Sequence, residues 1–219
     1  MNKILLFLNI LFISIGTMFF SYKEKVVNNI FNSVIFIDPG HGGKDNGTSY
    51  NDIFEDELNL KLATILYESL LEDNVIAYIS RVSDYDLSSQ YAKNHKIEDL
   101  NKRIKYIDSL STTLFVSLHL NYYLNSNVNG LQVFYQNNNS KSELLANTIQ
   151  KYLNKENKKD KKCKVGDFYL LNKTKTTGVL IEYGFLSNEY DRENLLKDKY
   201  LYHLSTIIKK GIYEYLLTY

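Results

Sequence analysis

The sequence predicts an α/β fold, with a single three-layer α/β/α domain built around a central mixed, mostly parallel sheet. Short apolar runs that are typical of buried strands alternate along the chain with longer segments of helical periodicity. The chain has 219 residues, 44% of them hydrophobic and 23% charged, which suits one domain with a sizeable core. No internal repeat or linker divides it, and we expect the folded domain to span residues 34–219.

The N-terminus differs from the rest of the chain. Lys3 precedes an apolar run over residues 4–20 that only four small or polar residues interrupt. This pattern is typical of an export signal, although no A-x-A cleavage site follows, and the run is about as long as the shortest membrane-spanning helices. We therefore expect residues 1–22 to be a signal peptide or a signal anchor. The domain would then be exported, either secreted or anchored through this segment alone. The alternative is a buried N-terminal helix.

Charge and cysteine content exclude some classes of protein. The formal net charge is +1, which gives no electrostatic reason to expect binding to nucleic acid. Cys163 is the only cysteine, so the chain has neither an internal disulfide nor a zinc site built from several cysteines.

The first predicted strand is an apolar run at residues 34–37. It ends at an Asp-Pro-Gly turn at residues 38–40 that contains the only proline. His41 would therefore lie just beyond the carboxyl end of a core strand, where ligand sites form in open α/β sheets. We expect Gly42 and Gly43 to leave open space beside it.

The next segments continue the alternation of strand and helix. Helical spacing of leucines and isoleucine predicts a helix over 56–72, followed by a strand over 75–79 and a polar loop over 81–96. Another helix follows, for which Asp99 is the expected cap, and Arg103 is expected to be an exposed residue of that helix.

The second half of the chain repeats this pattern. A third strand over 114–118 leads to His119, and Glu182 follows the last strand. The remaining predicted elements are a strand over 131–135, a helix after 140, a loop over 154–164, short strands over 168–171 and 179–181, and helices over 189–196 and 200–217.

Two histidines and two glutamates occupy related positions. His41, His119 and Glu182 each follow a strand, and Glu55 stands at the start of the first long helix. The carboxyl ends of parallel strands gather at one edge of a sheet, so these side chains can converge there. Two imidazoles and one carboxylate, with a water in the open position, form a catalytic zinc site, and the other glutamate would be the general base.

Each of these residues also has a structural interpretation. A histidine after a strand is often a hydrogen-bonded turn residue, and Glu55 would favour a helix N-terminus through the macrodipole. The spacing of these residues alone does not decide between the structural interpretations and a zinc site. His95 and His203 do not end strands, and we interpret them as structural or surface residues.

Four motifs, in order, resemble one known family. They are Ile-Asp-Pro-Gly-His-Gly-Gly at 37–43 with Glu55, Ser-Leu-His-Leu-Asn at 117–121, Gly-Leu-Gln-Val-Phe-Tyr at 130–135, and Val-Leu-Ile-Glu-Tyr-Gly-Phe-Leu-Ser-Asn at 179–188. Together they resemble the zinc-dependent N-acetylmuramoyl-L-alanine amidases of type 3 over residues 34–219.

This resemblance implies the roles of the site residues. His41, Glu55 and His119 would hold one Zn²⁺ ion, and Glu182 would be the catalytic base. The family cleaves the amide between the lactyl group of N-acetylmuramic acid and the L-alanine of the peptide stem. Asn121 and Arg81 are the expected substrate-binding residues, with Arg81 meeting carboxylates of the stem.

Within the family, the chain resembles the sporulation-type members that act on spore cortex peptidoglycan. Those members remove stem peptides before muramic-δ-lactam is formed, and such a protein would act in the forespore intermembrane space. Its partners would be glycan strands with stem peptides, together with an accessory protein that orders the site. The alternatives are a vegetative autolysin, a cell-separation amidase, a zinc carboxypeptidase, or a non-catalytic wall-binding regulator on the same fold.

Overall fold

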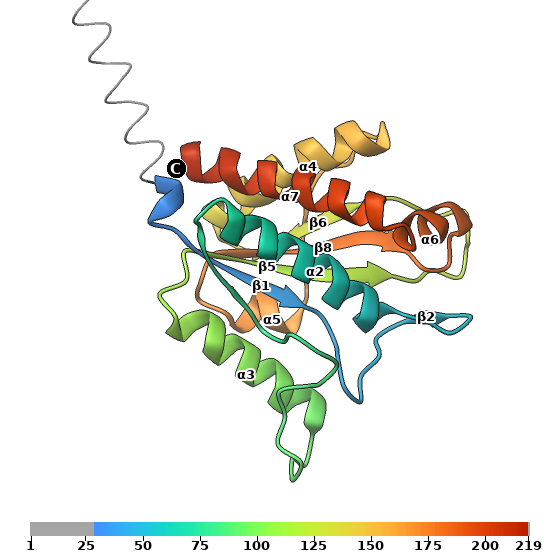
Figure 1. The fold of residues 1–219 in the computed structure, drawn as a ribbon, viewed down its shortest axis with the longest axis horizontal. Helices are drawn as coiled ribbons and strands as arrows, with labels where there is room; N and C mark the ends of the chain where they lie inside the picture. The colour runs from blue at the N-terminus through green and yellow to red at the C-terminus, as the bar shows by residue number, and fades with distance from the viewer. Residues whose placement is uncertain (1–28, 219) are drawn as a thin grey trace, which may run out of the picture.

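The computed structural model describes residues 29–218, and the predicted signal segment 1–22 lies outside them. A six-stranded sheet with the order β4-β1-β5-β8-β6-β7 forms its centre (Figure 1). Its strands are β1 (Val34–Pro39), β4 (Ile76–Ile79), β5 (Leu114–Asn121), β6 (Gln132–Tyr135), β7 (Lys164–Val165) and β8 (Gly178–Phe185). A two-stranded hairpin, β2 (Ser49–Tyr50) and β3 (Ile53–Phe54), stands apart from this sheet.

Strand directions agree with the predicted mixed sheet. Strand β1 runs parallel to β4 and β5, β5 runs parallel to β8, and β6 runs parallel to β7. Only the β6–β8 pair is antiparallel among these pairings. The carboxyl ends of β1, β5 and β8 therefore meet at one edge of the sheet.

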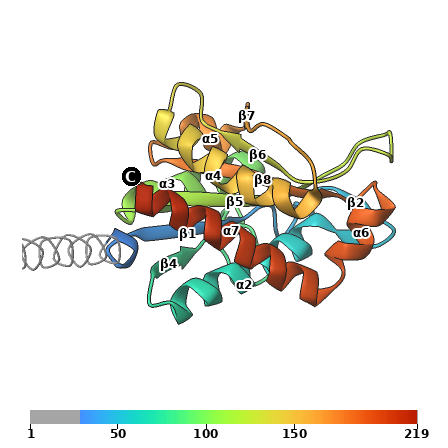
Figure 2. The same cartoon turned by 90° about the horizontal axis from the view of Figure 1, so that it is seen from above.

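Helices cover both faces of the sheet. They are α2 (Glu55–Glu72), α3 (His95–Ser109), α4 (Ser140–Asn157), α5 (Tyr169–Lys173), α6 (Glu189–Leu195) and α7 (Asp198–Thr218). Helices α2, α4 and α7 pack on one face and α3 and α5 on the other, as the two views in Figures 1 and 2 show. A larger apolar cluster lies on the first side, and a smaller one on the second. The predicted three-layer α/β/α class is confirmed.

The alternation of side chains along the strands places the polar residues on one face. Phe36, Phe115 and Leu180 belong to the apolar cluster beneath α3 and α5. Because side chains two residues apart in a strand point to the same side, Asp38 and Glu182 share that face at the sheet edge. His119, four residues beyond Phe115, shares it as well. The fold therefore directs these groups into the space between the sheet, α3 and α5.

Three expected elements differ from the structure. The run 168–171, predicted as a strand, forms the short helix α5, whose Leu170 and Leu171 are buried. Helix α4 extends into the expected loop 154–164 and ends at Asn157. The α3 cap is Asn94, whose side chain accepts a hydrogen bond from Ile97 N, rather than Asp99.

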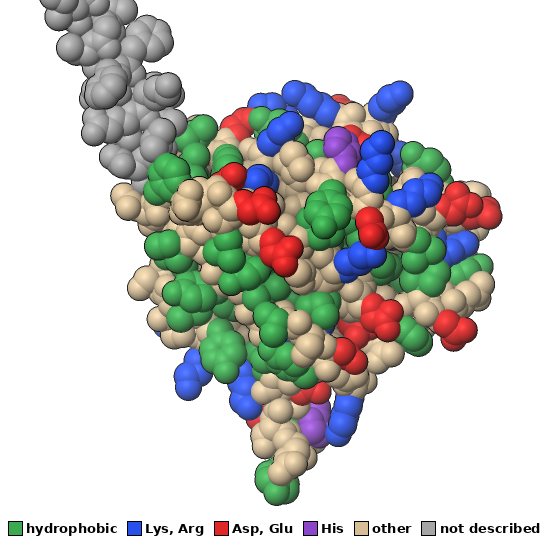
Figure 3. Space-filling view, viewed as in Figure 1, with side chains coloured by type: hydrophobic (Ala, Val, Ile, Leu, Met, Phe, Trp, Pro, Cys, Tyr) green, Lys and Arg blue, Asp and Glu red, His purple; other side chains and the backbone are tan. Residues whose placement is uncertain are grey.

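The outer surface carries charges of both signs. Figure 3 shows acidic and basic side chains interspersed over one face of the molecule, in keeping with a net charge of +1.

Within residues 29–218, none of the helices has the length and apolar character needed to cross a lipid bilayer.

Candidate active site

His41 lies in the turn after β1, in a left-handed backbone conformation with φ of 62°. Few residues other than glycine adopt this region, so the surrounding structure must hold it in place. Arg103 does so by donating from Nη2 to the His41 carbonyl oxygen at 2.7 Å. Asp45 accepts from the ring, with 3.0 Å between Oδ2 and Nδ1. The other ring nitrogen, Nε2, is thereby directed away from Asp45 and toward Glu55.

The two glycines after His41 do not leave the open space that the sequence suggested. A Cβ atom on Gly42 would lie 2.6 Å from the carbonyl oxygen of Tyr85, and one on Gly43 would lie 2.7 Å from the amide nitrogen of Asp86. Both glycines have positive φ angles of 127° and 64°. They are needed because the loop before α3 packs directly on this turn.

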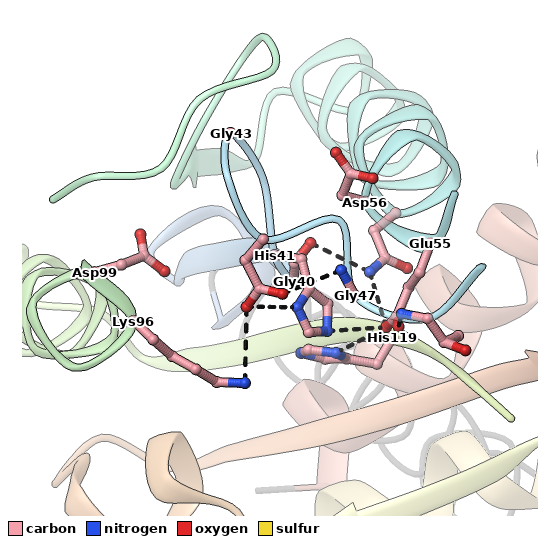
Figure 4. Close-up of polar contacts among 12 residues, drawn as sticks. Gly40, His41, Gly43, Gly47, Glu55, Asp56, Lys96, Asp99 and His119 are labelled. Atoms are coloured by element: carbon pink, nitrogen blue, oxygen red, sulfur yellow. Dashed lines mark hydrogen bonds and ion pairs between the residues drawn. The ribbon is translucent and has the colours of Figure 1, made fainter. Parts of the chain in front are cut away.

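Three side chains of metal-ligating types converge beside this turn. The carboxylate oxygen Oε1 of Glu55 lies 3.3 Å from His41 Nε2 and 3.1 Å from His119 Nδ1. One ligand atom from each of the three residues lies within 4.8 Å of the others. Figure 4 shows His41, in the turn after β1, and His119, in β5, pointing toward Glu55, which projects from the first turn of α2. The structure thus brings together the three residues proposed as ligands.

The carboxylate of Glu55 is held on both oxygens. Oε1 accepts from Leu120 N at 3.0 Å and from the Asn59 amide at 3.3 Å, and Oε2 accepts from Thr48 N at 2.8 Å. Burial alone would raise the pKa of Glu55, but the contacts with His119 and His41 hold it well below its usual range. This carboxylate is therefore ionised and rigidly oriented, which is what a metal ligand requires.

Glu182 faces the same space from β8 but lacks a partner. It stands opposite His119 in the parallel β5–β8 register and is 7% exposed. Its Oε2 is buried and has no hydrogen-bond partner among the described residues. Burial and the negative charge of Glu55 raise the pKa of Glu182 to about 8. A carboxyl group in this state can exchange a proton near neutral pH.

The donor set fits a zinc ion. Two imidazole nitrogens and one carboxylate oxygen form the three-ligand set of catalytic zinc sites, in which a fourth position stays open. Asp45 supplies the carboxylate that commonly orients a zinc-bound histidine. Glu182, with its unpartnered oxygen, is among the residues that line the same cavity.

The cavity occupies about 340 Å³ between the sheet edge, α3 and the segment leading into α5. Its polar lining includes His41, Glu55, His119 and Glu182. Its apolar lining comes from Leu100, Leu120, Phe168, Tyr169, Leu170 and Leu180. A substrate with a polar reacting group flanked by small apolar substituents suits this mixed lining.

Arg81 does not serve the role expected from the sequence. Its side chain is 1% exposed, and its guanidinium donates to the backbone carbonyls of Pro39, Ser83, Gly40 and Asp56. These bonds tie β4 to the turn before His41. The buried guanidinium is turned toward the protein, so its placement opposes the predicted contact with stem carboxylates.

Arg103 is also buried, at 1% exposure, whereas the sequence suggested an exposed residue. It donates to Asp38 at 2.7 Å and to Asp99 at 2.8 Å, and it also bonds the Pro39 carbonyl at 2.7 Å. Burial alone would raise the pKa of Asp38, but Arg103 and the neighbouring hydroxyl donors hold it below its usual value. The predicted surface residue is therefore a buried support of the histidine turn.

The remaining sequence candidates lie outside the cluster. Asn121 ends β5 and uses Oδ1 to accept from the next amide, Tyr122 N, and it does not line the cavity. His95 begins α3, with Nδ1 2.6 Å from Ser88 Oγ. His203 lies on α7 beside Glu156. Neither histidine belongs to the candidate metal site of His41, Glu55 and His119, in agreement with their interpretation as structural or surface residues.

Sequence reasoning missed two side chains at the site, Asp45 and Lys96. Asp45 follows His41 by four residues, and this spacing across a glycine turn was the available signal. Lys96 lines the cavity from α3 and lies 3.8 Å from Asp45. Nothing in its polar surroundings distinguished it from other surface lysines.

Comparisons with known proteins agree with this geometry. Residues 35–214 match the family described as N-acetylmuramoyl-L-alanine amidase. The germination-specific N-acetylmuramoyl-L-alanine amidase of Bacillus subtilis is 33% identical over 210 residues, covering 90% of this chain and 89% of that protein. The amidase LytC of the same organism is 30% identical over 88% of this chain and 38% of its own length.

Solved structures show the same fold. The CwlD amidase from Clostridioides difficile, solved in complex with the GerS lipoprotein, aligns with a TM-score of 0.82 at 30% identity. The alignment covers 86% of this chain and all of that one. The catalytic domain of CwlV from Bacillus (Paenibacillus) polymyxa aligns with a TM-score of 0.73 at 30% identity, over 84% and 98% of the two chains. From the matched motifs, the fold and these relatives, the chain belongs to the type-3 N-acetylmuramoyl-L-alanine amidases, which hydrolyse peptidoglycan.

Proposed function

We propose that this protein uses one zinc ion to hydrolyse the amide between N-acetylmuramic acid and L-alanine in spore cortex peptidoglycan. The observation that carries the proposal is the convergence of His41, Glu55 and His119 on one point, with the unpartnered carboxyl of Glu182 in the same cavity. The catalytic domain would span residues 34–219.

The ligand residues would each contribute through their fixed orientation. His41 would bind through Nε2, because Asp45 occupies Nδ1. His119 would bind through Nδ1, the nitrogen nearest to Glu55, and Glu55 would bind through Oε1. When bound, the zinc ion supplies a Lewis acid that polarises the amide carbonyl and lowers the pKa of water.

Glu182 would move the proton during hydrolysis. Its carboxylate accepts a proton from the attacking water as the new carbon–oxygen bond forms. The same carboxyl group then donates that proton to the amide nitrogen, so that the carbon–nitrogen bond breaks and the stem leaves as a free amine. The absence of another hydrogen-bond partner on Oε2 among residues 29–218 supports this role.

The apolar lining of the cavity would accept the groups that flank the scissile amide. The lactyl unit and L-alanine each carry a methyl group, and Leu100, Phe168 and Leu180 offer apolar surface in the same cavity as the ligand residues. Burying methyl groups there would exclude bulk water from the reacting amide.

The cortex role is supported by the germination-specific relative at 33% identity over nearly the whole chain. We propose that stem removal by this protein precedes muramic-δ-lactam formation, with residues 1–22 directing export to the forespore intermembrane space as a signal peptide or anchor. An accessory protein that orders the site is supported by the complex of CwlD with the GerS lipoprotein. The similarity to LytC supports the vegetative autolysin as the second candidate.

Mass spectrometry of digested peptidoglycan tests the reaction. An amidase releases intact stem peptides, whereas a carboxypeptidase shortens stems by one terminal amino acid and a wall-binding regulator releases nothing. Spores that lack the gene should contain no muramic-δ-lactam, and retained muramic-δ-lactam would exclude the cortex role. Elemental analysis with and without a candidate lipoprotein would show whether zinc loading depends on it.

A further inference from the structure

The cavity is lined by an exposed positive charge in addition to the groups that the reaction uses. Among the described residues that line it, Lys96 is the only lysine. Its side chain is 67% exposed and makes one ion pair, at 3.8 Å from Asp45 Oδ2. The other cationic group there, the guanidinium of Arg103, is buried and bonded to Asp38 and Asp99. Lys96 is therefore the cation that a ligand can reach.

The positive charge of Lys96 does not stabilise the helix on which it lies. It is the second residue of α3, immediately after His95, in the turn that Asn94 caps. A positive charge in the first turn opposes the helix macrodipole. Its partner Asp45 is already engaged by His41 at 3.0 Å and by Gly47 N at 3.1 Å. The weak pairing of Lys96 leaves its ammonium group available to another anion.

Lys96 also extends toward the reacting groups. Figure 4 shows its side chain reaching from α3 toward the turn that carries His41. Single contacts connect Lys96 to Asp45, Asp45 to His41, and His41 to Glu55. Extended peptide advances ~3.4 Å per residue, so a group two residues from the scissile amide lies ~7 Å from it. Lys96 Nζ and His41 Nδ1 contact the same oxygen of Asp45, at 3.8 Å and 3.0 Å, so the two nitrogens are no more than about 7 Å apart.

We propose that Lys96 binds the free carboxylate of the second stem residue and so selects substrates in which that carboxylate is not amidated. The proposal rests on the proposed function, because it assumes that the stem leaves from this cavity. It replaces Arg81 as the cation that meets the stem. Partial desolvation of Lys96 by the bound stem would strengthen a pair that is otherwise weak at an exposed site.

The test compares two synthetic muramoyl-tripeptide substrates that differ only in the second stem residue, with a free carboxylate in one and a carboxamide in the other. The zinc-loaded protein should cleave the carboxylate form with a kcat/KM about 3- to 10-fold higher. Lys96→Gln should lose this preference, and Lys96→Arg should retain it. Lys102→Gln is the matched control, because Lys102 lies on the same helix, pairs with Glu98, and does not line the cavity.

Each outcome decides the proposal. A purely structural role through Asp45 would lower kcat/KM equally for both substrates, so an unchanged preference in Lys96→Gln would overturn the assignment. Equal kcat/KM of the unmodified protein for the two substrates would overturn it as well. Absence of stem release from both substrates would instead reject the proposed function and this inference with it.

Discussion

Two groups of charged side chains lie at the same edge of the sheet but differ in how fully they are paired. In the first group, Arg103 is bonded to Asp38 and Asp99, and Asp38 also accepts from Ser80 and Ser117. In the second group, one ligand atom from each of His41, His119 and Glu55 lies within 4.8 Å of the others. Glu182 has a buried oxygen with no hydrogen-bond partner among the described residues. Both groups border one cavity.

The difference separates structural from functional charges. A buried charge is tolerated when an opposite charge and hydrogen bonds compensate for lost hydration, as they do around Arg103. The opposite arrangement at Glu182 raises its pKa to about 8, because burial and the nearby negative charge of Glu55 both disfavour ionisation. Such an uncompensated group is a candidate catalytic residue and adds little to stability, in keeping with the role proposed for Glu182.

The largest expected effect on activity comes from replacing the carboxyl group of Glu182, which has no compensating partner. Glu182→Gln keeps the size of the side chain but cannot carry the proton, so stem release should fall by ~10²–10⁴-fold while zinc content and unfolding stability are retained. Release of muropeptide stems, measured by chromatography, checks this outcome. Glu72→Gln, at an exposed position at the end of α2, is the matched control. Undiminished release by Glu182→Gln would exclude the assigned role.

Breaking the compensated group should instead reduce stability. Arg103→Met leaves the buried Asp38 without its cationic partner, and the free energy of unfolding should drop by ~3–5 kcal/mol. Urea unfolding followed by circular dichroism measures the change. The double variant that adds Asp38→Asn should recover part of the loss, since the carboxylate at position 38 is then no longer buried without a cation. A loss below about 1 kcal/mol in Arg103→Met would mean that the pair is not a principal support of the turn.

Asp45 contacts the second group through the His41 ring, and its replacement should have an intermediate effect. Asp45→Asn keeps a side chain of similar size but weakens the acceptor for His41 Nδ1, so zinc affinity should fall by ~10–100-fold. Competition with a chelator of known affinity measures this change. Unchanged zinc affinity would show that Asp45 does not orient the ring.

The smallest effect is a pH dependence of stability at Asp38. Its folded-state pKa is lowered from 3.8, so its contribution is fully present above about pH 5 and declines as the pH falls through the folded-state value. Asn at this position has no such dependence. The stability difference between the wild-type protein and Asp38→Asn should therefore shrink from pH 6 to about pH 3 in urea unfolding. A stability difference that stays constant between pH 6 and about pH 3 would contradict an ionised Asp38–Arg103 pair.

The sequence predicted those features of the fold that depend on local patterns of apolar and polar residues. Apolar runs located the central strands, and their alternation explains why Asp38, His119 and Glu182 share one face. The run 168–171 was misassigned because four apolar residues do not distinguish a short helix from a strand. In the structure this segment forms part of the cavity wall beneath α3.

The missed features depend on contacts between residues far apart in the chain. Arg103 looked like an exposed helix residue because its partner Asp38 is 65 residues away. Gly42 and Gly43 suggested an opening, but the 81–96 loop packs against them and could not be placed from a polar sequence without periodicity. Lys96 can be recognised as a residue of the cavity only from the position of α3 in the structure.

Zinc titration of three metal-free proteins tests the division of roles most directly. The wild-type protein and Glu182→Gln should each bind one zinc ion per chain with similar affinity, because Glu182 is assigned as the base and not as a ligand. His119→Ala should lose most of that affinity. Loss of zinc binding in Glu182→Gln, or wild-type affinity in His119→Ala, would contradict the account.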